Sequence, residues 1–358
     1  MLKIKMLQYK GKCIYFKLFE IINETERNWT KKKLLEKLHL SYSSLARCNY
    51  CETRATTNIY ELMCIEFSLK EVDLNEIIEL TSEIYDSVYY KLKQNYNNYL
   101  EKLDELIKER VIVFPILMLF KLFILVNSIP IQVVQKEYRE HYLKLKVYKD
   151  FFVDEIYGIY VLVELIFETE VKHIKNHIYN DELFFQILSV KNFEINDYNA
   201  SLLYAEKAEK EFEKNKNFIR VISTNLTKIA CLNHCQEYKE AYKLAKSCFL
   251  GIRSLNRKIN ELFFVELHYL LATIGLKRYK EAISILKEKE KFNMNDCLAY
   301  VIIINKSNNK IDKSILEKTI AEGCFVEDIK NYIENNDRNY IFNIIDQYNL
   351  SGVFKTLI

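Results

Sequence analysis

The stretch Thr30-Lys-Lys-Lys-Leu-Leu-Glu-Lys-Leu-His-Leu-Ser-Tyr-Ser-Ser-Leu-Ala-Arg47 predicts a short helix, a tight corner and a second helix. Thr30 and Ser41 stand where the two helices need N-caps, because a hydroxyl oxygen accepts a hydrogen bond from an unpaired N–H of the first turn. The corner position is His39, although such a corner favours a positive φ and therefore glycine. Leucines at the spacing of two crossed helices would pack between them: Leu34, Leu38, Leu40 and Leu45.

The side chains left outside this helix pair are mostly basic or hydroxylated, a set that suits phosphate oxygens and base edges. We therefore expect this surface to bind double-stranded DNA, with Arg47 pairing with a guanine and Lys31 to Lys33 holding phosphates. Arg54 lies in a polar loop over 49–57. The candidate DNA-binding residues are Lys31, Lys32, Lys33, Tyr42, Ser43, Ser44, Arg47 and Arg54.

Composition favours an all-α protein. The 358 residues include six Gly and two Pro, and hairpins and phosphate-binding loops depend on glycine. The net charge of +3 hides an asymmetry, because residues 1–70 hold 13 Lys and Arg against 7 Glu, whereas the remainder holds 39 basic against 42 acidic residues. A basic amino-terminal region on a mildly acidic body fits a nucleic-acid-binding domain joined to a regulatory domain.

The hydrophobic pattern divides the chain into three regions. We expect a helix-turn-helix DNA-binding domain over 13–70, a linker helix over 71–110 and a helical repeat domain over 111–358. In the linker, apolar residues from Ile77 to Leu106 recur at steps of three, four and seven. The apolar run from Val111 to Val126 is shorter than the ~20 residues that span a membrane. We interpret it as a helix buried on all sides.

Three blocks of the carboxyl-terminal half align with one another. Their tyrosines, Tyr198, Tyr238 and Tyr279, are 40 and 41 residues apart, and a small residue follows each tyrosine three positions later. We expect the tyrosine to fill the corner of a helical hairpin and the small residue to let the next helix approach closely. Each block resembles the second helix of a tetratricopeptide repeat, stretched beyond that family's 34-residue period. The aligned blocks are Asp197-Tyr-Asn-Ala-Ser-Leu-Leu-Tyr-Ala205, Glu237-Tyr-Lys-Glu-Ala-Tyr-Lys-Leu-Ala245 and Arg278-Tyr-Lys-Glu-Ala-Ile-Ser-Ile-Leu286.

The short helices of 13–70 resemble the lambda-repressor-like helix-turn-helix domain, with Leu35 in place of a small residue and His39 in place of glycine. With the repeats behind it, the chain is similar to the peptide-sensing regulators of low-GC Gram-positive bacteria and their phages: the Rgg, Rap, NprR, PlcR and PrgX group and the arbitrium receptors. This resemblance implies a cytoplasmic homodimer that binds a short signalling peptide in the repeats and DNA through its amino-terminal domain.

An asparagine carboxamide both donates to and accepts from a peptide backbone, so Asn225 is our first candidate for peptide binding. The further candidates are Arg220, Lys228 and His268. Two other function classes remain open. The chain could be a repeat-based protein-interaction module that does not bind DNA, as in phosphatase or anti-activator relatives, or an enzyme built on a helical scaffold.

No sequence motif indicates catalysis or a cofactor: the chain has no Gly-rich phosphate loop, no H-E-x-x-H and no G-x-S-x-G. Nine scattered cysteines fit a reducing cytosol, and no secretory signal opens the chain. We expect no metal, because no second C-x-x-C pair follows the first. The alternative metal ligands are Cys48 and Cys51 with His39 or Cys64, and Glu170 with His173 and His177.

Overall fold

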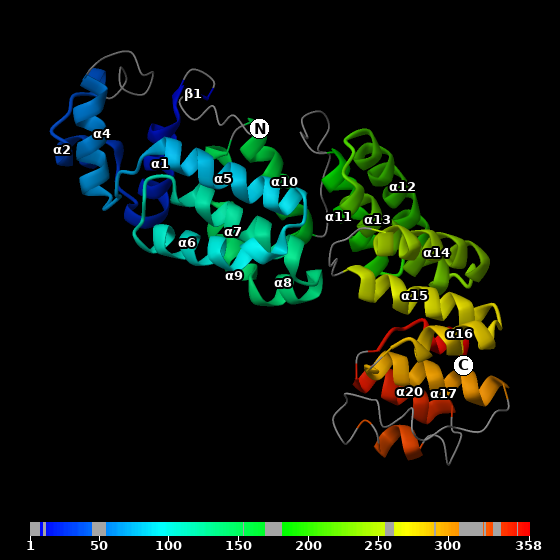
Figure 1. Cartoon of the computed structure of the whole chain (residues 1–358). Coiled ribbons are helices and arrows are strands. Elements are labelled where there is room, and N and C mark those ends of the chain that lie inside the picture. The colour runs from blue at the N-terminus through cyan, green and yellow to red at the C-terminus, as the bar shows by residue number, and fades with distance from the viewer. Residues whose placement is uncertain are drawn as a thin grey trace. The chain divides into compact units, whose positions relative to one another are not determined.

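The computed structural model describes residues 8–9, 12–44, 55–152, 154–168, 181–254, 261–289, 291–307, 325, 327–331, 338–348 and 350–358. They form two compact units, Met1–Ile187 (unit 1) and Leu188–Ile358 (unit 2), drawn in Figure 1. The described elements are helices, apart from a hairpin of two-residue strands, β1 (Gln8–Tyr9) and β2 (Lys12–Cys13). The expected helical class is therefore confirmed.

Unit 1 is a succession of helices joined by short turns. Its helices are α1 (Ile14–Ile22), a π-helical turn (Asn23–Arg27), α2 (Lys31–Lys37), α4 (Ala55–Glu66), α5 (Leu74–Tyr89), α6 (Tyr96–Lys108), α7 (Phe114–Ser128), α8 (Ile131–Glu137), α9 (Arg139–Lys146) and α10 (Asp154–Phe167), with short 3₁₀ turns at Lys93–Asn95 and Lys149–Phe151. Helix α11 (Asp181–Glu194) contains the boundary between the two units.

Helix α7 forms the core of unit 1. It packs against α5, α6, α8, α9 and α10, and nearly every residue from Phe114 to Val126 is buried. Pro115 lies in its first turn, where the missing N–H breaks no helical hydrogen bond. The prediction of a helix buried on all sides is confirmed. None of the described helices is long and apolar enough to cross a membrane.

The expected linker is two helices rather than one. Helix α5 ends at Tyr89, Lys91 after it has a left-handed φ of 53°, and the N–H of Leu92 donates back to the carbonyl of Ser87 at 2.7 Å. This bond closes the end of α5, and α6 then begins at Tyr96. Both helices pack on α7, so their apolar faces serve the core of unit 1.

The amino-terminal helices are joined to this core by backbone and side-chain bonds. Lys70 and Val111 form a parallel bridge, in which the N–H of Lys70 donates to Arg110 at 3.0 Å and the N–H of Ile112 donates to Lys70 at 2.8 Å. The Arg110 guanidinium pairs with Glu26 of the π-helical turn at 2.5 Å. These contacts hold α1 and α4 to the core.

Unit 2 is built from helices that pack on their neighbours in sequence. Helix α13 also contacts α15, and α15 also contacts α17, so alternate helices lie against each other. The helices are α12 (Tyr198–Lys214), α13 (Phe218–His234), α14 (Tyr238–Ser254), α15 (Glu261–Gly275), α16 (Tyr279–Lys287), α17 (Met294–Ser307), α20 (Arg338–Gln347) and α21 (Phe354–Leu357).

The sequence repeat recurs as a repeated backbone geometry. The residues two positions before the three tyrosines, Asn196, Gln236 and Lys277, have φ values of 63°, 63° and 59°. In each case the next N–H donates to a carbonyl five residues back, at 2.9, 2.8 and 3.1 Å. The aligned small residues are fully buried, as expected for positions where helices approach closely: Ser201, Ala241 and Ala282.

The tyrosines pack at the corner of the following hairpin. The Tyr198 ring stacks on His234, with centroids 4.9 Å apart and planes at 18°. The Tyr238 ring lies against Gly275, where an added Cβ would meet ring atoms at 2.4 Å. His234 and Gly275 occupy equivalent positions, each four residues before the next tyrosine. Gly275 therefore leaves room for the Tyr238 ring at the position where, one repeat earlier, His234 stacks on the Tyr198 ring.

We predict that Gly275→Ala lowers the free energy of unfolding by about 1–3 kcal/mol, because the new methyl group overpacks the Tyr238 ring. Gly251→Ala is the matched control. Gly251 lies near the end of α14 with nothing within 4 Å of an added Cβ, so alanine there should stabilise by up to about 1 kcal/mol. Urea unfolding measures both, and equal changes would contradict the close approach at Gly275.

Candidate functional site

The predicted helix, corner and helix of 30–44 have the expected local geometry. The Thr30 hydroxyl accepts from the N–H of Lys33 at 3.3 Å, and the Ser41 hydroxyl accepts from the N–H of Ser44 at 3.1 Å. His39 has a φ of 51°, as the corner requires. Leu35, which stands where a small residue was expected, is buried. The helix after Ser41 is described only as far as Ser44.

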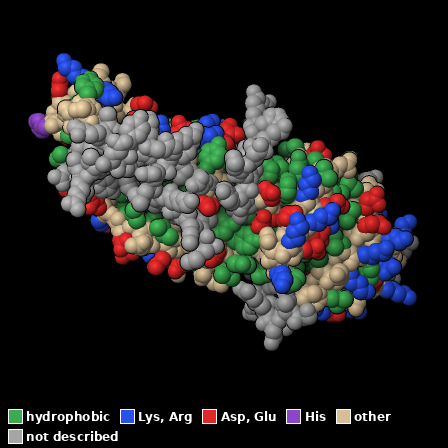
Figure 2. Space-filling model, turned by 90° about the horizontal axis from the view of Figure 1, so that it is seen from above, with side chains coloured by type: hydrophobic (Ala, Val, Ile, Leu, Met, Phe, Trp, Pro, Cys, Tyr) green, Lys and Arg blue, Asp and Glu red, His purple; other side chains and the backbone are tan. Residues whose placement is uncertain are grey.

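The candidate DNA-binding residues that the structure describes lie on one surface, which we call the basic face: Lys31, Lys32, Lys33, Tyr42, Ser43 and Ser44. All are exposed except Ser44, which is half-buried, and Tyr42 is 59% exposed. The Lys31 ammonium lies 5.7 Å from the centroid of the Tyr42 ring, so α2 and the segment after the corner meet here. Figure 2 shows Lys and Arg side chains at the surface of the segment that contains α2, on the left of the view. Arg47 and Arg54 lie outside the described residues.

Trp29 supports the basic face, and the sequence analysis missed it. Its ring has the Lys33 ammonium 5.3 Å from its centroid, the Arg27 guanidinium at 5.4 Å and the Phe67 ring at 6.4 Å. An apolar residue directly before an N-cap is a known signal, because it often packs on the first turns of the helix. Because Thr30 is recognisable as an N-cap, the apolar residue directly before it, Trp29, could have been predicted to pack on α2.

The candidate peptide-binding residues lie on two helices that contact each other. Arg220 and Asn225 of α13 are buried, at 3% and 7% exposure. Lys228 of α13 pairs with Glu209 of α12 at 2.7 Å. His268 of α15 is half-buried, and its carbonyl accepts from the Asn233 amide of α13 at 3.0 Å. The structure thus brings His268 to α13, and it places Arg220 and Asn225 in the interior of unit 2.

Two buried amide oxygens on α13 have no hydrogen-bond partner among the described residues: Oδ1 of Asn225 and Oδ1 of Asn233. A buried acceptor left unpaired costs about 1–3 kcal/mol. Asn233 has no sequence signal of its own, because asparagine is common near helix ends for local reasons.

The histidines of this region have lowered pKa values because burial disfavours the charged imidazolium. Burial, with a smaller contribution from the neighbouring His234, lowers the pKa of His268 to about 4. The pKa of His234 is also lowered by burial. Both imidazoles are therefore neutral at pH 7, and the Tyr198 hydroxyl lies 3.2 Å from Nδ1 of His234.

Within the described residues, no group of three or more His, Cys, Asp or Glu side chains is placed to hold a metal ion. Cys64 is buried in α4. The positions 48, 51, 170, 173 and 177 lie outside the described residues.

No protein-family model matches the chain, and no curated protein and no solved structure matches it significantly. The function is therefore inferred from the geometry alone. Unit 1 carries a capped, basic helix and corner, and unit 2 carries a repeated helical hairpin.

We predict that unit 2 loses stability on acidification because of His268. Its pKa is about 4 when folded and about 6.5 when unfolded, so between these values the unfolded chain binds more protons. The contribution of neutral His268 to the free energy of unfolding is fully present above pH 6.5. It decreases as pH falls, by up to about 3 kcal/mol near pH 4. Thermal unfolding from pH 8 to 4 should show a shallower pH dependence for His268→Gln. An unchanged dependence would contradict this assignment.

Proposed function

We propose that this protein is a DNA-binding transcriptional regulator that is switched by a short peptide bound in its helical repeats. The basic face supports the DNA-binding half of the proposal, and the unpaired amide oxygens of α13 support the peptide-binding half. The lambda-repressor-like and tetratricopeptide-like resemblances of the sequence agree with this assignment.

The basic face has the charge distribution that a duplex needs. Three consecutive lysines stand at the start of α2, and Lys32 has a carboxylate partner at 3.9 Å, Glu36, on the exposed surface. Exposed pairs of this kind contribute about 1 kcal/mol or less, so the positive charge of this surface persists. Clustered lysines gain affinity from phosphates by releasing counterions, and the neighbouring hydroxyls add directed hydrogen bonds.

Peptide binding is supported by the need of α13 for hydrogen-bond donors. An extended peptide offers one N–H per residue, and the oxygens of Asn225 and Asn233 are buried acceptors without partners among the described residues, so a peptide would reach them where the packing around α13 opens. Helical repeats contact mainly their neighbours, so a ligand that bridges α13 and α15 changes the packing of the repeats as a unit. The peptide shifts DNA affinity only by its differential affinity for the two states, commonly about 1–3 kcal/mol.

A repeat-based interaction module without DNA binding is the second candidate, and exposed apolar residues of unit 2 favour it. Ile195 and Phe218 are 68% and 67% exposed, and Phe264 at the start of α15 is 51% exposed. A protein partner that covered these side chains would remove their apolar surface from water. A gel shift with the full chain at low salt separates the two candidates, because the interaction module would not retard duplex DNA.

We predict that Lys32→Ala weakens binding to specific and random duplexes alike and lowers the salt slope by about 1, because it removes one phosphate contact. Arg47→Ala should weaken specific binding by about 1–3 kcal/mol and random binding less, because it removes a base contact. Fluorescence anisotropy on the upstream DNA of the gene, across a salt series, measures both. Lys239→Ala, at an exposed position of α14, is the control for the loss of one positive charge. Equal losses on both duplexes for Arg47→Ala would refute its base contact.

We predict that Asn225→Leu raises the free energy of unfolding by about 1 kcal/mol, because it removes a buried acceptor that lacks a partner. The same variant should lose affinity for the peptide encoded in the reading frame next to the gene, as measured by calorimetry. Asn199→Leu, on the exposed surface of α12, should change stability by less than about 0.5 kcal/mol and leave peptide binding intact. A stabilised variant that still binds the peptide fully would remove Asn225 from the site.

A further inference from the structure

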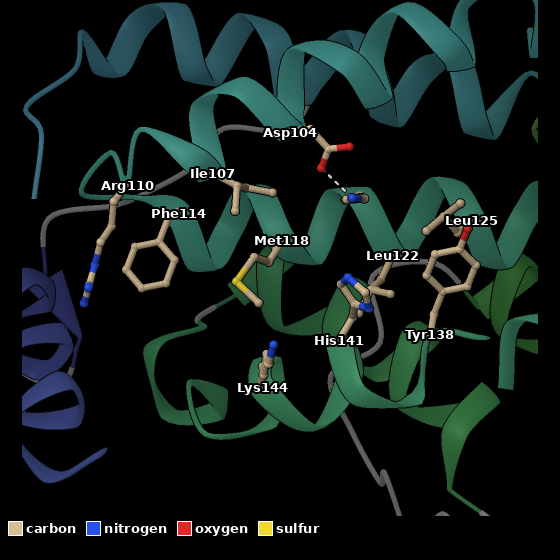
Figure 3. Close-up of a pocket in the computed structure, with 11 residues that line it drawn as sticks. Asp104, Ile107, Arg110, Phe114, Met118, Leu122, Leu125, Tyr138, His141 and Lys144 are labelled. Carbon is tan, nitrogen blue, oxygen red and sulfur yellow. Dashed lines mark hydrogen bonds and ion pairs between the residues drawn. The ribbon is translucent and has the colours of Figure 1, made fainter. Parts of the chain in front are cut away.

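Unit 1 contains a cavity of about 350 Å³ between α6, α7, α9 and Tyr138, the residue before α9, shown in Figure 3. No residue of the basic face lines it. Its volume falls at the lower end of the range for small-molecule sites, about 300–1,000 Å³.

One side of this cavity is apolar. It is lined by side chains of α6 and α7: Ile107, Phe114, Met118, Leu122 and Leu125. Figure 3 shows Phe114 and Met118 projecting from α7 toward α9. The Met118 side chain is only half-buried although the rest of α7 around it is buried, so an apolar surface remains open here. An apolar ligand would remove that surface from water.

The lining also carries four basic groups, Arg110, Lys121, His141 and Lys144, and two of them are paired with carboxylates. Lys121 pairs with Asp104, and Arg110 pairs with Glu26 at 2.5 Å. Asp104 is the only acidic residue in the lining, and its charge is already paired with that of Lys121. It therefore does not neutralise the other two basic groups.

The two remaining basic groups, Lys144 and His141, are neighbours on one face of α9, three residues apart. Within the described part of the chain, neither pairs with a carboxylate; His141 contacts the Tyr138 ring at 5.7 Å. An ammonium and an imidazole N–H beside an apolar wall match an anionic head on a hydrocarbon chain.

We propose that this cavity binds an amphipathic monocarboxylate, with its carboxylate accepting hydrogen bonds from Lys144 and His141 and its chain packed on Met118 and Leu122. Taking about 30 Å³ as the space of a water molecule, the cavity holds roughly a dozen non-hydrogen atoms. That size corresponds to a medium-chain fatty acid such as decanoate. A second charge on the ligand would find no further uncompensated cation in the lining, so a monoanion fits better than a phosphate ester.

The test is calorimetric titration of the full chain with decanoate and, in parallel, with decanol, below the concentrations at which either aggregates. We expect decanoate to bind with one-to-one stoichiometry and decanol to bind more weakly. Lys144→Gln should weaken decanoate about five-fold and leave decanol unchanged, because it removes the charge that decanoate alone uses. Lys136→Gln, an exposed lysine on α8 outside the cavity, is the matched control and should change neither.

Met118→Trp fills the cavity and should abolish binding of both ligands, with circular dichroism showing that the helices are retained. The proposal is overturned if decanoate does not bind the parent chain. It is also overturned if Lys144→Gln and Lys136→Gln bind decanoate equally well, or if a folded Met118→Trp variant still binds it. Lys144→Gln is at an exposed position, so its result stands even if Met118→Trp does not fold.

Discussion

The fold depends on ending helices without glycine. Among the described residues, nine residues other than glycine have a positive φ, and they lie at successive turns between helices: Asn28, His39, Ser68, Lys91, Arg110, Asn196, Lys216, Gln236 and Lys277. A left-handed residue with a side chain costs roughly 1 kcal/mol more than glycine. The chain tolerates this because, after eight of these nine residues, the next backbone N–H reaches a free carbonyl at the helix end; at Asn28 its own N–H does so. The corners of both units, including the one under the basic face, are built in this way.

This constraint explains what the sequence could and could not predict. Hydroxyl caps have a local cause, so Thr30 and Ser41 were predictable, and the positive φ of His39 followed from the corner between them. The buried α7 and the repeated corners followed from long apolar and periodic patterns. The end of α5 at Tyr89 could not be predicted, because the left-handed residue that follows it is Lys91, and a lysine in a periodic stretch gives no sign of a left-handed turn.

The candidate sites differ in predictability for another reason. Lysines and serines at exposed helix positions can be recognised from spacing alone, so the exposure of the described residues of the basic face could be predicted. The unpaired oxygen of Asn233 and the cavity beside Met118 arise from how distant helices pack, and no local pattern encodes that packing. Arg220 and Asn225 look like surface residues of a helix in sequence, and tertiary packing has buried both. The contacts of Arg47 and Arg54, outside the described residues, stay predictions.

The equivalence of His234 and Gly275 has an evolutionary consequence. The same corner receives a tyrosine ring in both places, once by stacking on an imidazole and once by leaving a gap. Each ring and its partner, Tyr198 with His234 and Tyr238 with Gly275, lie less than one period of 40 or 41 residues apart in the sequence. A gene duplication that copies a full period would therefore keep this spacing. An insertion or deletion shorter than a period, between a tyrosine and its partner, would change it.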